Sequence, residues 1–135
     1  MSISHFRELE VWQLAMALAK QVYQAVSGLP REERYGLSAQ LQRSAVSIPS
    51  NIAEGNARAS LKDYLRFISI AQGSCAELQT QLLLSIELFP EVALALQECL
   101  STCNRVGQML LRLHQALSQR LDAESRIPSS ESRTF

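Results

Sequence analysis

Little in this sequence points to a specific chemistry. Only 6% of the 135 residues are aromatic, and the chain has five glycines, four prolines, three cysteines and two histidines. Lysine and arginine total 13, and aspartate and glutamate also total 13, so the formal net charge is zero. A neutral chain has no long-range field that attracts nucleic acid or an anionic membrane. Any such contact has to come from a local cluster of charges.

The sequence motifs of the common enzyme classes are also missing. The chain contains no H-E-x-x-H, Walker A, G-x-G-x-x-G or G-x-S-x-G pattern. Of the two histidines, His5 lies near the start and His114 lies deep in a helical pattern. We therefore expect no catalytic residues, no cofactor and no enzymatic activity.

The three cysteines, Cys75, Cys99 and Cys103, cannot all pair with one another, and each lies inside a helical pattern. Cys99 and Cys103 share a helix face, which is a spacing that can hold a metal. Leucine would serve equally well at both positions, so we predict buried free thiols in a reducing compartment and no metal site.

No apolar run reaches the length of about 18 residues that a membrane span needs. The first residues, MSISHFRELEVW, do not read as a signal peptide. With 47% apolar and 19% charged residues, the composition is typical of a soluble globular domain. We expect a cytoplasmic protein that does not contact membranes.

Apolar residues that recur every three or four positions predict four amphipathic helices. Their expected ranges are about 6–27, from between 33 and 38 to about 54, 61–89 and about 91–122. Pro49 should kink the second helix without ending it. Ser60 and Asp63 form a capping box variant at the start of the third. The break at Pro90 is so short that the third and fourth helices must lie antiparallel.

These helices predict an all-α protein with an antiparallel up-and-down four-helix bundle at residues 1–123 and a disordered tail at 124–135. The third helix carries a second apolar strip, which consists of Phe67, Ile70, Leu84 and Leu88. This surplus favours oligomerisation. Gly73 and Gly107 lie equally far from Pro90, so they mark either a close approach of the two helices or two unrelated tolerated glycines.

The second helix carries a polar stripe beside its apolar stripe, with steps of four and three residues: Gln40, Ser44, Ser47, Asn51 and Glu54. We interpret this stripe as a second contact surface, which serves a partner helix, another subunit or a ligand. Glu54 should pair with Arg58 at i, i+4. Glu77 should pair with an arginine or glutamine of a neighbouring helix or subunit. Neither carboxylate has a nucleophile nearby, which argues against catalysis.

Three basic residues, Arg58, Lys62 and Arg66, step by four across the start of the third helix, and Arg43 precedes them. A ring of subunits that repeated this row could contact RNA or DNA. Acidic neighbours, Glu54 and Asp63, favour the alternative of a solvated face with ion pairs. The sequence leaves both readings open.

A set of local motifs resembles the family of four-helix bundle proteins, some of which are encoded in intervening sequences of bacterial large-subunit ribosomal RNA genes. The matching segments are Leu9-x-Val11-Trp12, Tyr35-Gly36-Leu37, Gln40-x-x-Arg43-Ser44-Ala45, Ser47-Ile48-Pro49-Ser50-Asn51-Ile52-Ala53-Glu54-Gly55 and Ala71-x-Gly73-Ser74-x-x-Glu77, with Gln81. The resemblance covers residues 6–121, and the run SIPSNIAEG is its most specific part.

The resemblance implies a four-helix bundle that assembles into a ring-shaped homopentamer. A related branch comprises accessory proteins of diversity-generating retroelements, which bind nucleic acid and a reverse transcriptase through a basic barrel. The present chain differs from that branch in its neutral charge balance. The resemblance therefore implies a non-enzymatic oligomer that binds RNA or DNA, or alternatively a protein scaffold or reverse-transcriptase accessory subunit.

Overall fold

Four long helices make up nearly all of the computed structural model, which describes residues 5–126. They are α1 (Glu10–Val26), α2 (Leu37–Asn56), α3 (Leu61–Leu88) and α4 (Ala93–Ser125). Short 3-10 turns, η1 (Phe6–Glu8), η2 (Arg31–Glu33) and η3 (Pro90–Val92), precede α1, α2 and α4. The described part of the chain contains no strand, so the expected all-α class is confirmed.

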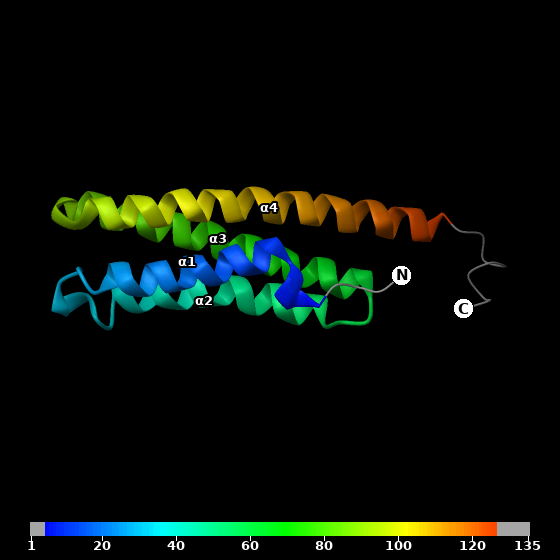
Figure 1. The fold of residues 1–135 in the computed structure, drawn as a ribbon, viewed down its shortest axis with the longest axis horizontal. Coiled ribbons are helices and arrows are strands. Elements are labelled where there is room, and N and C mark those ends of the chain that lie inside the picture. The colour runs from blue at the N-terminus through cyan, green and yellow to red at the C-terminus, as the bar shows by residue number, and fades with distance from the viewer. Residues whose placement is uncertain (1–4, 127–135) are drawn as a thin grey trace.

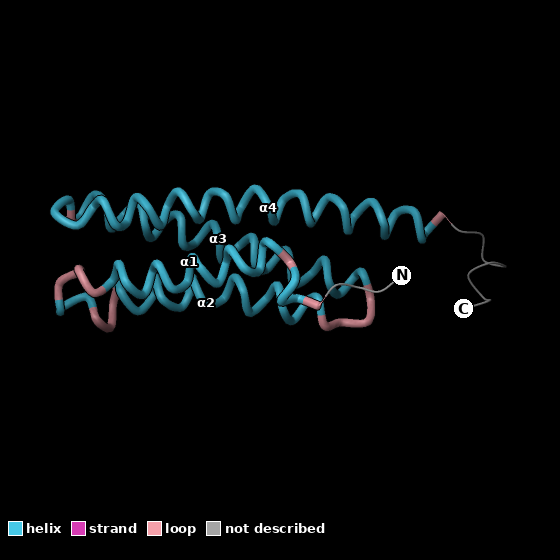
Figure 2. The backbone as a smooth tube through the Cα atoms, viewed as in Figure 1, coloured by secondary structure: helices cyan, strands magenta, loops and turns pink. Residues whose placement is uncertain are grey.

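The helices run alternately up and down, and the connections lie at the two ends of the bundle (Figures 1 and 2). Each helix packs against two neighbours, in the cyclic order α1, α2, α3, α4. α1 and α3 are therefore diagonal and parallel to each other. α4, with 33 residues and a length of about 50 Å, extends beyond the other helices at its C-terminal end.

The residues that begin α3 satisfy its free backbone donors. Ser60 has an extended backbone, and its hydroxyl oxygen accepts a hydrogen bond from the N–H of Asp63 at 3.1 Å. The capping box variant predicted from the sequence is thus confirmed at its serine half. This cap fixes the first turn of α3 and the level at which α3 meets α2.

α2 continues through Pro49, as the sequence predicted, and ends two residues beyond the approximate end expected at Glu54. The helix reaches Asn56, and Gly55 lies buried inside it. A Cβ atom on Gly55 would lie 2.8 Å from the Cβ of Phe67 in α3. At Gly55, α2 and α3 therefore approach closely, because no side chain separates the two backbones.

The apolar stripes of the four helices meet in one core. Its largest fully buried side chains are Leu18, Val22, Leu41, Ile48, Ile52, Ile68, Leu78, Leu82, Leu96, Val106 and Leu110. All three cysteines are free and buried, as predicted. Sγ of Cys75 and Sγ of Cys103 lie 3.5 Å apart across the α3–α4 contact. Ser69, earlier in α3, meets His114, later in α4, at 3.3 Å, which confirms that these helices lie antiparallel.

Close approach at the paired glycines, one of the two readings of Gly73 and Gly107, is not what the structure shows. A Cβ on Gly73 would meet nothing within 4 Å, and one on Gly107 would lie at ordinary contact distance, 3.5 Å, from Sγ of Cys75. Gly73 is exposed and faces away from α4. Equal spacing from Pro90 fixes the level of two residues along the axis, but it does not fix the direction in which they face.

The remaining boundaries differ from prediction by a few residues. The first helix begins at Glu10 because η1 precedes it, and α4 extends to Ser125, past the expected boundary at 123. From residue 127 onward, the predicted tail lies outside the described residues. No helix among residues 5–126 combines the length and the apolarity that crossing a bilayer requires.

Candidate functional site

Polar side chains that hydrogen-bond with one another lie in a surface groove between α2 and α3. At its centre, the hydroxyl oxygens of Ser47 and Ser74 lie 2.7 Å apart and share a hydrogen bond across the two helices. Asn51 donates from Nδ2 to Oγ of Ser47 at 3.0 Å and to the carbonyl oxygen of Ser47 at 2.8 Å. Small hydroxyl side chains let the helices approach closely and pair with each other at the floor of the groove.

Two adjoining hollows continue the groove toward the start of α2. The first, about 380 Å³, is lined by Gln40, Arg43, Ser44, Ser47, Glu77 and Gln81. The second, about 440 Å³, shares Gln40, Glu77 and Gln81 and adds Leu37, Gly73, Ala76, Thr80 and Leu84. We call these two hollows together the α2–α3 groove.

One buried polar atom in the groove has no hydrogen-bond partner. The side-chain oxygen Oε1 of Gln81 is inaccessible to solvent, and no donor among the described residues reaches it. The backbone carbonyl of Gln81 is satisfied, because Ser85 donates to it at 2.7 Å. An unpaired buried acceptor costs about 1–3 kcal/mol.

Apolar residues lie on the same face of α3 at both ends of the polar centre. Ile70, Leu84 and Leu88 are 42%, 45% and 55% exposed. Ile70, Glu77 and Leu84 are seven residues apart and so lie nearly in line along α3. The fourth residue of the predicted strip, Phe67, is buried instead.

The structure brings together most of the polar residues that the sequence singled out. Gln40, Ser44, Ser47 and Glu77 line the α2–α3 groove, and Asn51 joins it by hydrogen bonds to Ser47. Glu54 lies apart at the end of α2, where it pairs with Arg58 at 2.8 Å as predicted. Within residues 5–126, Glu77 forms no ion pair, although Arg43 lines the same hollow.

The predicted basic row is divided. The guanidinium groups of Arg58 and Arg66 lie over the ring of Phe67, with Cζ 4.8 and 4.5 Å from its centroid. Arg66 also lies 3.9 Å from Asp63. Lys62 lines an opening together with Arg58, Arg120 and Glu124. Arg43 is about 20 Å away along α2, because some 13 residues separate it from the helix end.

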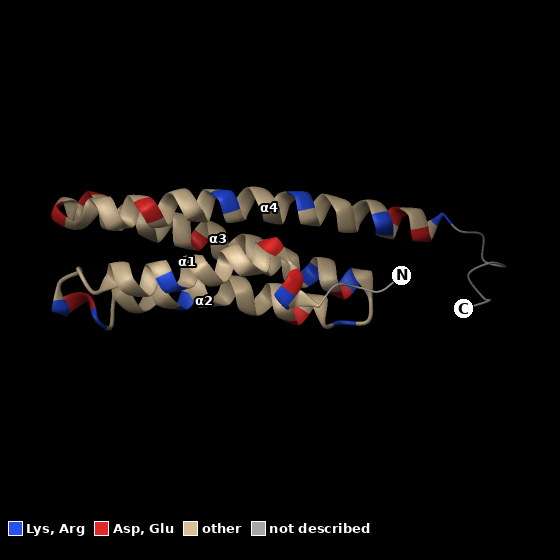
Figure 3. Ribbon diagram, in the orientation of Figure 1, with Lys and Arg blue, Asp and Glu red and all other residues tan. Residues whose placement is uncertain are grey.

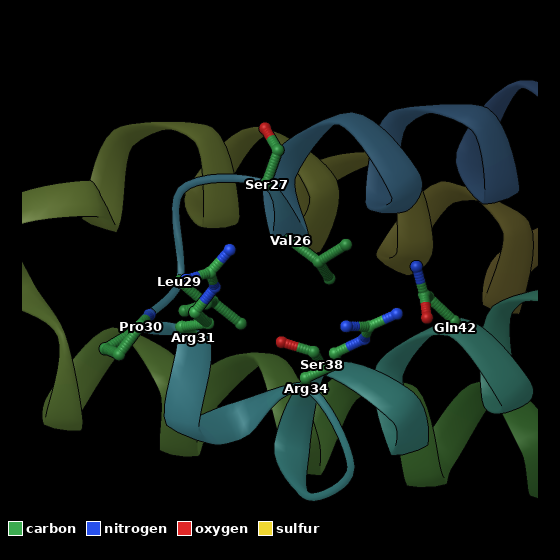
Figure 4. Close-up of a pocket in the computed structure, with 8 residues that line it drawn as sticks. All are labelled: Val26, Ser27, Leu29, Pro30, Arg31, Arg34, Ser38 and Gln42. Carbon is green, nitrogen blue, oxygen red and sulfur yellow. The ribbon is translucent and has the colours of Figure 1, made fainter.

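Another opening lies at the opposite end of the bundle, under the last turn of α1. Arg31, Arg34, Ser38 and Gln42 line it together with Val26, Ser27, Leu29 and Pro30. Figure 4 shows the guanidinium groups of Arg31 and Arg34 extending toward the opening from η2 and the turn that follows it. Both arginines are exposed, so the opening encloses no ligand position.

The other reactive groups are either buried or isolated. Burial raises the pKa of Cys99 to about 11, and the neighbouring Cys75 together with burial raises the pKa of Cys103. Nε2 of His114 lies 3.3 Å from Oγ of Ser69. Between residues 5 and 126, no group of three or more His, Cys, Asp or Glu side chains could hold a metal ion.

The profile of one protein family matches most of the amino-acid sequence. The match covers residues 7–112, which include α1, α2, α3, the residues that line the groove and the first 20 of the 33 residues of α4. Its description is 23S rRNA-intervening sequence protein. The chain belongs to this family. The resemblance inferred from the SIPSNIAEG run and its neighbours is confirmed.

A solved structure supports the fold of this intervening-sequence protein. It is a protein of unknown function from the S23 ribosomal protein family of Bacteroides thetaiotaomicron, with 20% identity and a TM-score of 0.69. The match covers 77% of the present chain and 97% of the other. No curated protein matches the chain. At this identity, the similarity establishes the shared helical fold alone.

Several residues that line the groove were not site candidates in the sequence. On the α3 side they include Gly73, Gln81 and Leu84, of which Leu84 was assigned only to the apolar strip. Two of these could have been found from periodicity, since Leu84 lies seven residues and Gln81 four residues after Glu77. Arg120 was also missed, because it joins Lys62 only through the packing of α4 on α3.

Proposed function

We propose that this intervening-sequence protein is a non-enzymatic scaffold that assembles with copies of itself through the α2–α3 groove. The observation that carries the proposal is the surface strip of Ile70, Leu84 and Leu88, which continues the groove and is left uncovered by the bundle. Exposed apolar residues in line along a helix are typical of a face that packs against another helix. A cytoplasmic location and a closed ring, such as a pentamer, fit this function.

The polar centre supports the same surface. Gln81 and the exposed carboxylate of Glu77 both line the groove, and they lie between the apolar ends of the strip. Polar groups inside an apolar helix contact fix its register at some cost in stability. A groove that combines both features suits a specific contact with a matching helix better than it suits an enclosed small ligand.

The test is a charge placed in the strip. Leu84→Glu should reduce the mass of the assembly toward that of a single 15.1 kDa chain, measured by light scattering after size exclusion. Leu111→Glu is the matched control, because Leu111 is 51% exposed and lies on α4. An assembly that persists in the Leu84 variant, or that is equally lost in the control, would overturn the proposed surface.

A second function, contact with RNA or DNA, is favoured by one specific observation. Arg58, Lys62 and Arg120 line one opening, which gives a local excess of positive charge at the start of α3. Glu54, which pairs with Arg58, and Glu124, which lines the same opening, reduce that excess. We rank this function second because the arginine charges of the predicted row are largely engaged within the chain.

Glutamine substitution of the predicted set tests it. Changing Arg43, Arg58, Lys62 and Arg66 together to glutamine should abolish binding to structured RNA and duplex DNA and leave the assembly mass unchanged. Wild-type binding should weaken steeply with salt. Equal affinity of the wild type and the variant would reject this function.

A further inference from the structure

The outer face of α1 carries an exposed lysine between two exposed apolar side chains. Met16 and Tyr23 are 46% and 50% exposed, and they lie four residues before and three residues after Lys20. These spacings place the three side chains on one face of the helix. Lys20 is exposed and is the single Lys or Arg of α1.

The groove lies in an acidic part of the chain. Between Phe67 and Asn104, the sequence contains four glutamates, Glu77, Glu87, Glu91 and Glu98, and no lysine or arginine. All four are exposed, and the part of α4 before Arg105 shows a red band and no blue one (Figure 3). Arg43 of α2 lines the groove. Glu77 of α3 is the carboxylate among the residues that line it.

The two surfaces lie at the same height along the bundle axis. Ala19 and Val46 line one hollow between α1 and α2, so Lys20 is level with Ala45. Ser44 and Glu77 line one hollow between α2 and α3, so Glu77 is level with Ser44. Lys20 and Glu77 therefore differ in height by about one residue, or about 1.5 Å.

We propose that the face of α1 formed by Met16, Lys20 and Tyr23 docks into the α2–α3 groove of the next copy of the chain. The Lys20 ammonium faces the Glu77 carboxylate, Met16 lies over Gly73, and Tyr23 packs on Leu84. This inference rests on the proposed self-association and names the surface that fills the groove.

The geometry of a ring agrees with this pairing. Rotation about an axis parallel to the bundle leaves the direction and height of every helix unchanged. α1 of one copy then runs parallel to α3 of the next, because the two helices are parallel within one chain. The contact joins two different surfaces, so it is head-to-tail and closes into a ring when the rotation allows.

Gly73 provides space for the incoming helix. A Cβ at this position would meet nothing within 4 Å, so the surface over Gly73 is open. Glycine at a helix contact allows a large side chain of the partner to reach the backbone. Met16 is unbranched and flexible, which suits it to fill an irregular space of this kind.

Charge reversal tests the pairing. Lys20→Glu and Glu77→Lys should each weaken self-association by about tenfold or more, because each places like charges opposite one another. The double variant Lys20→Glu/Glu77→Lys restores opposite charges and should recover the wild-type assembly. Glu98→Lys, an exposed charge change on α4, is the control and should leave the mass unchanged. Sedimentation over a concentration series measures all four variants.

The outcomes separate this inference from the proposed function. A wild type that is monomeric at every concentration overturns the self-association itself. A wild type that assembles, together with single variants that assemble equally well or a double variant that stays dissociated, overturns the Lys20–Glu77 pairing and leaves the self-association intact. Circular dichroism of each variant should show a folded bundle, because both substituted side chains are exposed.

Discussion

At Gly55 the backbone of α2 passes so close to α3 that the position accepts no side chain. A Cβ there would lie 2.8 Å from the Cβ of Phe67 and 3.2 Å from the carbonyl oxygen of Tyr64. The glycine at this position in the SIPSNIAEG run is therefore explained by packing. Its conformation is helical, so backbone freedom is not the reason.

Gly55→Ala should lower the free energy of unfolding. Overpacking of a tight contact costs about 1–3 kcal/mol, which exceeds the gain of about 1 kcal/mol from the better helix former. Gly107→Ala is the matched control, because a methyl group there meets only an ordinary contact with Cys75. Urea unfolding should show a loss for the first variant and no loss for the second, and the reverse order would contradict the packing.

Cys99 should make the stability of the bundle depend on alkaline pH. Burial raises its pKa from 9.0 to about 11. The folded state thus keeps the thiol proton over a range in which the unfolded chain releases it. The stabilisation is complete below pH 9 and is lost as the pH rises toward 11.

Comparison of wild type with Cys99→Ala isolates this contribution. The variant should be less stable at neutral pH, because it leaves a small cavity, but its unfolding midpoint should fall less steeply between pH 9 and 11. Thermal unfolding at several pH values measures both slopes. Equal slopes would show that Cys99 is not the group responsible.

At the scale of the helices, the most exact local signal in the sequence is the cap of α3. Ser60 accepts the N–H of Asp63, and the helix then continues to Leu88 without interruption. Ser60→Ala should lower stability by about 1 kcal/mol, whereas Ser60→Asp keeps an acceptor and adds a favourable charge at the helix start. Denaturant midpoints that are equal for alanine and aspartate would contradict this role.

The sequence predicted the helices well because periodicity, capping and proline act locally. It predicted the passage of α2 through Pro49, the pair Glu54–Arg58 and the burial of the cysteines. It did not reveal the contact of Gly55 with Phe67, because that depends on how α2 and α3 pack. The same cause explains Phe67, which was assigned to the uncovered strip but is covered by two arginines.

The candidate site was predicted in part for the same reason. The polar stripe of α2 could be read from a single helix, and most of it does line the α2–α3 groove. The α3 side of the groove required the register between two helices, which the hydrogen bond between Ser47 and Ser74 now fixes. Gln81 and Leu84 became site residues only with that register.

At the scale of the whole molecule, the bundle has a well-packed core, but some groups on its surface have no partner within the chain. Four helices bury most of the leucine and isoleucine stripes. Among the described residues, the α2–α3 groove still contains a carboxylate without an ion pair and an uncovered apolar strip. The family match adds that the chain belongs to the 23S rRNA-intervening sequence proteins. A second copy of the same chain would satisfy both features of the groove.

The mass of the wild-type protein at sedimentation equilibrium tests this central claim most directly. Self-association through the groove predicts a mass of at least twice 15.1 kDa, in whole multiples of the chain mass, that persists on dilution into the low micromolar range. A mass of 15.1 kDa at every concentration up to about 100 µM would contradict it.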